Sequence, residues 1–180
     1  MQRALIVLAV SLLVVVPAAV ASFKEECTDS LPGVEKALYY DRRCYMLSNK
    51  RAPFIPALSY CIDANITPTF SRGMLAVLTP EQAQFLSAYG VTSSNSSKPA
   101  WVNAIKVEKF NKWIWLETSG GFPIPVDSSM WSDGQPNNYF GNENCAIVWQ
   151  LGLADRPCSG EYQMLCQYQE PSLFPDAEYG

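Results

Sequence analysis

The sequence predicts an α+β domain that is held together by disulfide bonds. Two segments have helical features, several short segments have the aromatic and branched composition of strands, and six cysteines are available for cross-links. Between the strands, residues 117–144 are rich in Gly, Pro, Ser, Asn and Asp, and an irregular segment of this length inside a compact domain usually carries function. The 180 residues suit one domain of ordinary size.

The first 21 residues have the layout of a secretory signal peptide. Arg3 supplies a positive charge, residues 4–18 are almost entirely apolar, and Ala19 and Ala21 form an A-x-A cleavage site. A membrane anchor is the alternative, but the apolar run is shorter than the roughly 20 residues that span a bilayer. We therefore expect residues 1–21 to be removed and the mature protein to be secreted and extracellular, with no membrane span.

Both predicted helices lie in the first half of the chain. Residues 54–64 repeat apolar side chains at helical spacing. The second helix has a clear start, with Thr79 as N-cap, Pro80 at the first helical position and Gln82 completing a capping box, and it ends at Gly90.

The predicted strands are short and rich in aromatic and branched residues, and the tryptophans within them are expected to pack in the core. They comprise residues 38–45 (with a turn at 41–43), 74–78, 101–107, 113–116, 145–150 and 162–168.

Six cysteines in a secreted chain imply three disulfides, although fifteen pairings are possible. Zinc ligation is a poor alternative because the sequence contains no C-x-x-C pair. The cysteines are Cys27, Cys44, Cys61, Cys145, Cys158 and Cys166.

Composition excludes several classes of function. Without histidine the chain cannot form a Ser-His-Asp triad, a Cys-His nucleophile pair or an HExxH metalloprotease site. A glycosidase would need only carboxylates, but nothing in their context suggests a catalytic pair, so we do not expect an enzyme. The chain is weakly acidic, with a formal net charge of −4 and no run of Lys or Arg, and we expect no nucleic-acid partner.

From Cys44 to Cys166 the sequence resembles the C-type lectin-like domain family. The motifs that carry the resemblance occur in the family's order and cover about two-thirds of the chain. They are Cys44–Tyr45 ("CY"), Leu75–Val77 ("LASI"), Trp101–Ala104 ("WIGL", with Asn103 for the usual Gly), Trp113–Trp115 ("WxW"), Trp131 with Gly134–Asn137 ("W…GEPN" or "GQPD"), Glu143–Ile147 ("EDCV"), Ala154–Cys158 ("NDxxC") and Met164–Cys166 ("FIC").

The resemblance implies a fold and a disulfide pairing. In the family, two helices flank small antiparallel sheets, and a long loop region carries the binding site. The implied disulfides are Cys61–Cys166, Cys145–Cys158 and, as the extra N-terminal bridge of the long form, Cys27–Cys44. We expect a domain over residues 22–169, followed by a flexible tail over residues 170–180.

The resemblance also implies a calcium and carbohydrate site. The residues at the family's ligand positions are Gln135, Asn137, Glu143 and Asp155, whose side-chain oxygens suit calcium. In family members that bind sugar, calcium coordinates two sugar hydroxyls, the same side chains hydrogen-bond them, and the proline corresponding to Pro136 is cis.

This sequence departs from the family pattern at the site. Gln-Pro-Asn at 135–137 carries no charge, Ala154 replaces the usual Asn, and Leu153 replaces the usual Trp. Fewer charged ligands weaken calcium binding.

Two hypotheses follow from these departures. The first is a secreted lectin that recognises a carbohydrate or glycoprotein weakly through calcium. The alternative is a calcium-independent module that binds a protein or another non-sugar ligand. Asn95 and, less favourably, Asn65 lie in sequons for N-glycosylation.

Overall fold

The computed structural model describes residues 23–63, 70, 73–91, 98–119, 122–149 and 152–170. The expected signal peptide, the sequons at Asn65 and Asn95, and residues 171–180 lie outside the described residues. Glu170 is described and buried, and its carboxylate pairs with Arg42 at 3.0 Å, so the packed part of the chain extends to this residue.

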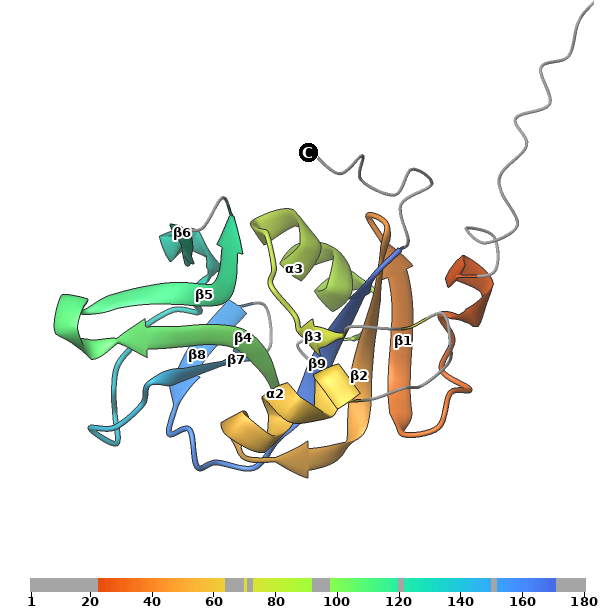
Figure 1. The fold of residues 1–180 in the computed structure, drawn as a ribbon. Helices are drawn as coiled ribbons and strands as arrows, with labels where there is room; N and C mark the ends of the chain where they lie inside the picture. The colour runs from red at the N-terminus through yellow and green to blue at the C-terminus, as the bar shows by residue number, and fades with distance from the viewer. Residues whose placement is uncertain are drawn as a thin grey trace, which may run out of the picture.

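Nine strands in the described part of the chain form one hydrogen-bonded sheet (Figure 1). The main path runs β1-β2-β9-β4-β5-β6, with β3 paired to β9 and the β7–β8 hairpin paired to β4. The strands are β1 (Val34–Tyr40), β2 (Arg43–Ala52), β3 (Met74–Leu75), β4 (Ala100–Val107), β5 (Lys112–Ser119), β6 (Phe122–Pro125), β7 (Cys145–Trp149), β8 (Gly152–Arg156) and β9 (Tyr162–Gln169). All pairs are antiparallel except β4–β9, which is parallel.

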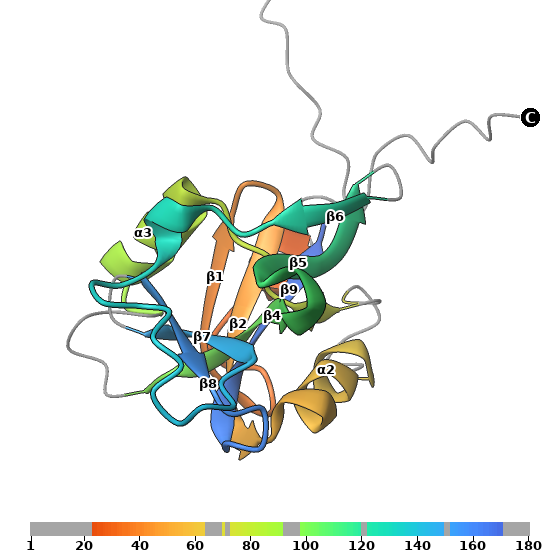
Figure 2. The ribbon, with the colours of Figure 1, turned by 90° about the vertical axis from the view of Figure 1, so that its left-hand side faces the viewer.

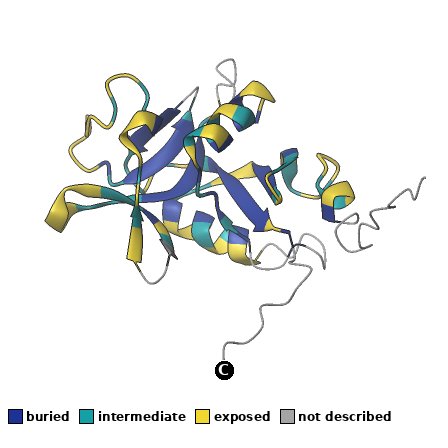
Figure 3. Ribbon diagram, turned by 90° about the horizontal axis from the view of Figure 1, so that it is seen from above, coloured by how far each residue is buried: buried dark blue, intermediate teal, exposed yellow. Residues whose placement is uncertain are grey.

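The helices α2 (Phe54–Asp63) and α3 (Pro80–Ala88) lie on opposite sides of the central strands (Figures 1 and 2). The reason is the alternation of side chains along β9. Met164 and Cys166 join the buried cluster that contains the apolar face of α2, whereas Leu165 joins the cluster that contains Leu86 of α3. Figure 3 shows the central strands buried while much of the helix and loop surface is exposed.

Three disulfides cross-link the domain, and their pairing is the one that the family resemblance implies. Cys27–Cys44, Cys61–Cys166 and Cys145–Cys158 have Cα–Cα distances of 5.8, 5.4 and 5.2 Å. The bridge from Cys61 to Cys166 ties α2 to β9, the strand at the centre of the sheet.

The structure confirms most predicted elements and corrects several. Residues 38–45 are part of a hairpin, in which Asp41 and Arg42 adopt positive φ angles between β1 and β2. The strand predicted at 74–78 is only two residues long. The segment 117–144 is less irregular than expected, because it contains the end of β5, all of β6 and a 3-10 turn. The sequence predicts no strand between residues 150 and 162, where the structure has β8.

The capping box of α3 is present as predicted. Thr79 Oγ1 accepts a hydrogen bond from the Gln82 N–H at 3.3 Å, and Gln82 Oε1 accepts one from the Thr79 N–H at 3.0 Å. The Gln82 amide also donates to Asp41 at 2.9 Å, which connects the helix start to the β1–β2 turn.

We expect Thr79→Ala to lower the free energy of unfolding by about 1 kcal/mol, because the first turn of α3 loses its side-chain acceptor. Chemical denaturation of the wild type and the variant measures the difference. Thr28→Ala, at an exposed threonine, is the control and should change stability by less than about 0.5 kcal/mol. Equal effects of the two substitutions would contradict the role of the cap.

Candidate binding site

The loop that carries the predicted site begins after a 3-10 turn, η2 (Ser128–Met130). Asp127 caps this turn by accepting hydrogen bonds from the N–H and hydroxyl of Ser129, and these bonds lower the pKa of the Asp127 carboxyl. The chain then runs beside β8, where the Ser132 N–H donates to the Leu153 carbonyl at 2.9 Å. A Cβ on Gly152 would lie 2.7 Å from Ser132 N, so this close approach requires glycine.

Asp155 on β8 holds the middle of the loop. Its side chain is buried, and its two carboxylate oxygens accept the backbone N–H groups of Asn137 at 3.0 Å and Asn138 at 2.7 Å. Hydrogen bonds to a charged acceptor are stronger than neutral ones. The Cys145–Cys158 disulfide fixes the hairpin that presents Asp155.

Asparagine side chains shape the rest of the loop. The Gln135–Pro136 peptide bond is cis, as the family resemblance implies. Asn137 Oδ1 accepts the Tyr139 N–H at 2.9 Å, and Asn138 Oδ1 accepts the Glu143 N–H at 3.0 Å. Asn138 has a φ of 48°, a left-handed conformation that asparagine tolerates better than most residues. These bonds bring Asn137, Glu143 and Asp155 into one hydrogen-bonded unit.

Three buried oxygens of the predicted site accept no hydrogen bond from the described part of the chain. They are Oε1 of Gln135 and both carboxylate oxygens of Glu143, whose side chain is 0% exposed. A buried polar atom without a partner is costly, and a buried carboxylate is much more so. A cation or a further hydrogen-bond donor next to these oxygens would therefore stabilise the folded site.

A guanidinium group lies next to Glu143. Arg156 Nη1 is 3.8 Å from Glu143 Oε1, and the same nitrogen donates a hydrogen bond to the Asp155 carbonyl at 2.6 Å. The guanidinium also lies 6.0 Å from the centre of the Trp149 ring, within range of a cation–π contact.

The donor set fits a calcium ion in part. The uncommitted oxygens of Gln135 and Glu143 are of the kind that calcium prefers. Asn137 and Asp155 also offer oxygens, but theirs already accept backbone N–H groups, and Ala154 supplies no side-chain donor. No group of three or more carboxylate, histidine or cysteine side chains suited to a metal gathers among the described residues.

Two exposed aromatic residues in the loop were missed by the sequence analysis. Tyr139 is 79% exposed and Phe140 is 66% exposed, and their rings form an edge-to-face pair with centroids 5.1 Å apart. The sequence did contain an indication of them, because two adjacent large aromatic residues stand out in a segment otherwise rich in Gly, Asn and Asp. By contrast, Trp101 and Trp115 are buried in the core as predicted.

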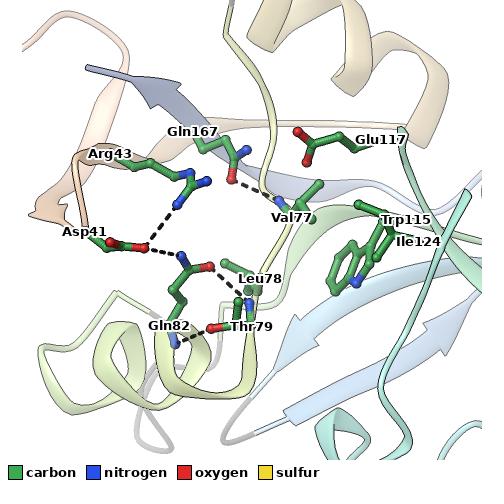
Figure 4. Close-up of a pocket in the computed structure, with 10 residues that line it drawn as sticks. All are labelled: Asp41, Arg43, Val77, Leu78, Thr79, Gln82, Trp115, Glu117, Ile124 and Gln167. Atoms are coloured by element: carbon green, nitrogen blue, oxygen red, sulfur yellow. Dashed lines mark hydrogen bonds and ion pairs between the residues drawn. The ribbon is translucent and has the colours of Figure 1, made fainter. Parts of the chain in front are cut away.

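A cavity of about 470 Å³ lies outside the loop, and none of the predicted site residues lines it (Figure 4). Several of its polar side chains bond to each other or to the backbone: Asp41 accepts from Arg43 and Gln82, and Gln167 accepts from the Val77 N–H. The cavity is lined by Asp41, Arg43, Val77, Leu78, Thr79, Gln82, Trp115, Glu117, Ile124 and Gln167. We infer that the bonds of Asp41 stabilise the β1–β2 hairpin and its contact with α3.

Residues 57–168, more than half of the chain, match the sequence model of the "Lectin C-type domain" family. The chain belongs to the C-type lectin family. Proteins of this family and fold are generally binding modules. In the part of this C-type lectin that the structure describes, no helix has the length and apolar character needed to cross a bilayer.

Curated relatives include lectins from snakes and a human protein. This C-type lectin is 29% identical over 89 residues to the "C-type lectin mannose-binding isoform" of Oxyuranus scutellatus, which covers 47% of this chain and 51% of that protein. It is 25% identical to the "C-type lectin" of Cerberus rynchops, with 70% and 77% covered. It is also 25% identical to the human "C-type lectin domain family 4 member G", with 69% and 38% covered. The match thus spans about half the length of the Oxyuranus scutellatus protein.

Solved structures share the fold of this C-type lectin. The carbohydrate-recognition domain of the mouse scavenger receptor C-type lectin has a TM-score of 0.59 at 21% identity, with 77% of this chain and 97% of that chain covered. A calcium-independent type II antifreeze protein has a TM-score of 0.55 at 16% identity, with 75% and 92% covered.

We expect Asp155→Asn to destabilise the domain by about 2 kcal/mol, because both loop N–H groups lose their charged acceptor and one of them then faces the amide NH2 in place of an oxygen. Urea denaturation measures the change. Asp133→Asn, in the same loop but exposed, should stay within about 0.5 kcal/mol of the wild type. A loop that does not depend on Asp155 would give the same result for both variants.

Proposed function

We propose that this C-type lectin is a secreted carbohydrate-binding protein, and that the loop from Gln135 to Glu143 forms its binding surface. The proposal rests chiefly on one observation: the exposed Tyr139–Phe140 pair lies in the same short loop as the uncommitted oxygens of Gln135 and Glu143. An aromatic ring can pack against the C–H face of a sugar, while amide and carboxylate groups bind its hydroxyls.

The scaffold supports this role because it holds the loop without help from a ligand. Asp155 accepts two loop N–H groups, and Asn137 accepts the N–H of Tyr139 itself. A loop held in its binding conformation loses less entropy when a ligand binds. The names of several relatives support a lectin activity, including a mannose-binding isoform.

We propose that calcium binds weakly at the same loop. Gln135 and Glu143 would hold the ion with their uncommitted oxygens, and Asn137 and Asp155 would contribute to its shell. When bound, the ion would supply a positive charge and open coordination positions for hydroxyl groups. Because only two of the four side chains are charged, its affinity should be low.

The proposed role is extracellular and non-enzymatic, and the disulfides and the carboxylate contacts of the site support it. Three disulfides, with no free cysteine among the described residues, are typical of proteins from oxidising compartments. The carboxylates of the site are engaged with backbone N–H groups or buried next to Arg156, an arrangement that supports binding and not acid–base chemistry.

The test is a glycan panel probed with the refolded or secreted mature protein, in millimolar calcium and in chelator. We expect a subset of glycans to bind, more weakly in chelator, and Tyr139→Ala to reduce binding of these glycans at least about tenfold, equivalent to roughly 1.4 kcal/mol. Phe122→Ala is the matched control, because Phe122 is 76% exposed on β6, outside the loop, and should bind like the wild type.

Two outcomes would contradict the proposal. If no glycan binds in either buffer, the exposed aromatic pair serves another partner, and the alternative of a module that recognises a protein gains support. If Tyr139→Ala and Phe122→Ala reduce binding equally, the sugar surface lies elsewhere on the domain.

A further inference from the structure

The burial of Glu143 poses an electrostatic problem that the loop must solve before any ligand arrives. Its side chain is 0% exposed, and neither oxygen accepts a hydrogen bond from the described residues. An unpaired carboxylate in this setting strongly disfavours the folded state. The only ion pair of Glu143 in the described part of the chain is with Arg156.

Arg156 is held in place by contacts of its own. Its Nη1 donates to the Asp155 carbonyl at 2.6 Å, its guanidinium lies over the Trp149 ring, and its side chain is only 21% exposed. Because arginine remains charged at any physiological pH, the positive charge beside Glu143 is permanent.

We propose that Arg156 is a built-in counter-cation for Glu143, which keeps the loop folded without metal and competes with calcium for the same carboxylate. The inference rests on the calcium site of the proposed function, but not on sugar binding. It extends that proposal because it attributes the low affinity for calcium to Arg156 as well as to the missing ligands.

The geometry favours competition over a permanent block. The 3.8 Å separation of Arg156 Nη1 and Glu143 Oε1 is an ion pair without a hydrogen bond, whereas the bond to the Asp155 carbonyl is short. The carboxylate oxygens are therefore free to accept a second cation, but its charge would lie close to the guanidinium. Two like charges near one carboxylate repel each other, which lowers the affinity for calcium.

The test is Arg156→Gln, which keeps a side chain able to donate to the Asp155 carbonyl but removes the charge. In chelator, we expect the melting temperature to fall by roughly 5 °C or more, because Glu143 loses its counter-ion. Calcium should then restore much of this loss and bind at least about tenfold more tightly than to the wild type, as measured by isothermal titration. The wild type itself should shift little in calcium.

The single variant Glu143→Gln and the double variant Glu143→Gln/Arg156→Gln complete the double-mutant cycle. With neither charge present, the double variant should melt above Arg156→Gln in chelator and should not respond to calcium. This variant keeps the test decisive if Arg156→Gln alone does not fold, because the proposal then requires the double variant to recover the fold.

Arg42→Gln is the matched control. Arg42 pairs at 3.0 Å with Glu170, whose side chain is 3% exposed, so this variant also removes the guanidinium partner of a buried carboxylate, at a place remote in sequence from the loop. We expect Arg42→Gln to be destabilised but to gain no response to calcium.

The proposal is overturned if Arg156→Gln and the wild type melt alike in chelator, or if both bind calcium with the same affinity. It is also overturned if the two substitutions of the double variant are additive. A negative glycan panel together with a positive calcium cycle would reject sugar binding alone and leave the role of Arg156 standing.

Discussion

The candidate site depends on one buried carboxylate. Asp155 lies on β8 and accepts the N–H groups of two consecutive loop residues, Asn137 and Asn138. Loop N–H groups that are buried without an acceptor would oppose this conformation, so the carboxylate stabilises the loop and specifies its path. The β7–β8 hairpin and the Cys145–Cys158 bridge place Asp155 where it can do this.

In the proposed function, the residues that support the loop differ from those that would recognise a ligand. The asparagine and aspartate oxygens that face the backbone accept N–H groups, whereas the oxygens of Gln135 and Glu143 accept none from the described residues and the ring of Tyr139 is exposed. A site whose shape depends on the protein alone can tolerate the loss of a metal ligand such as the one that Ala154 replaces. A site that needs calcium to fold would not.

Much of the fold could be predicted from local sequence, because the deciding signals are local. Thr79 and Gln82 mark a helix start by side-chain chemistry within one turn, and the structure bears this out. β8 could not be predicted, because Gly152–Arg156 has no clear alternation and its strand exists only by pairing with β7. The disulfide pairing followed from the resemblance alone, since six cysteines leave fifteen possibilities open.

The site was harder to predict because its properties arise from contacts between distant residues. Sequence position placed Glu143 among the ligands, but its complete burial depends on how the loop folds over it. Arg156 is separated from Glu143 by 13 positions, and no spacing rule predicts that their charged groups lie 3.8 Å apart. In the proposed calcium site, the uncharged Gln-Pro-Asn at 135–137, Ala154 and the guanidinium of Arg156 act in the same direction, because each lowers the attraction of the loop for a cation. The buried Asp155 carboxylate does not depend on the ion for its partners, so the loop keeps its conformation when calcium binds weakly or is absent.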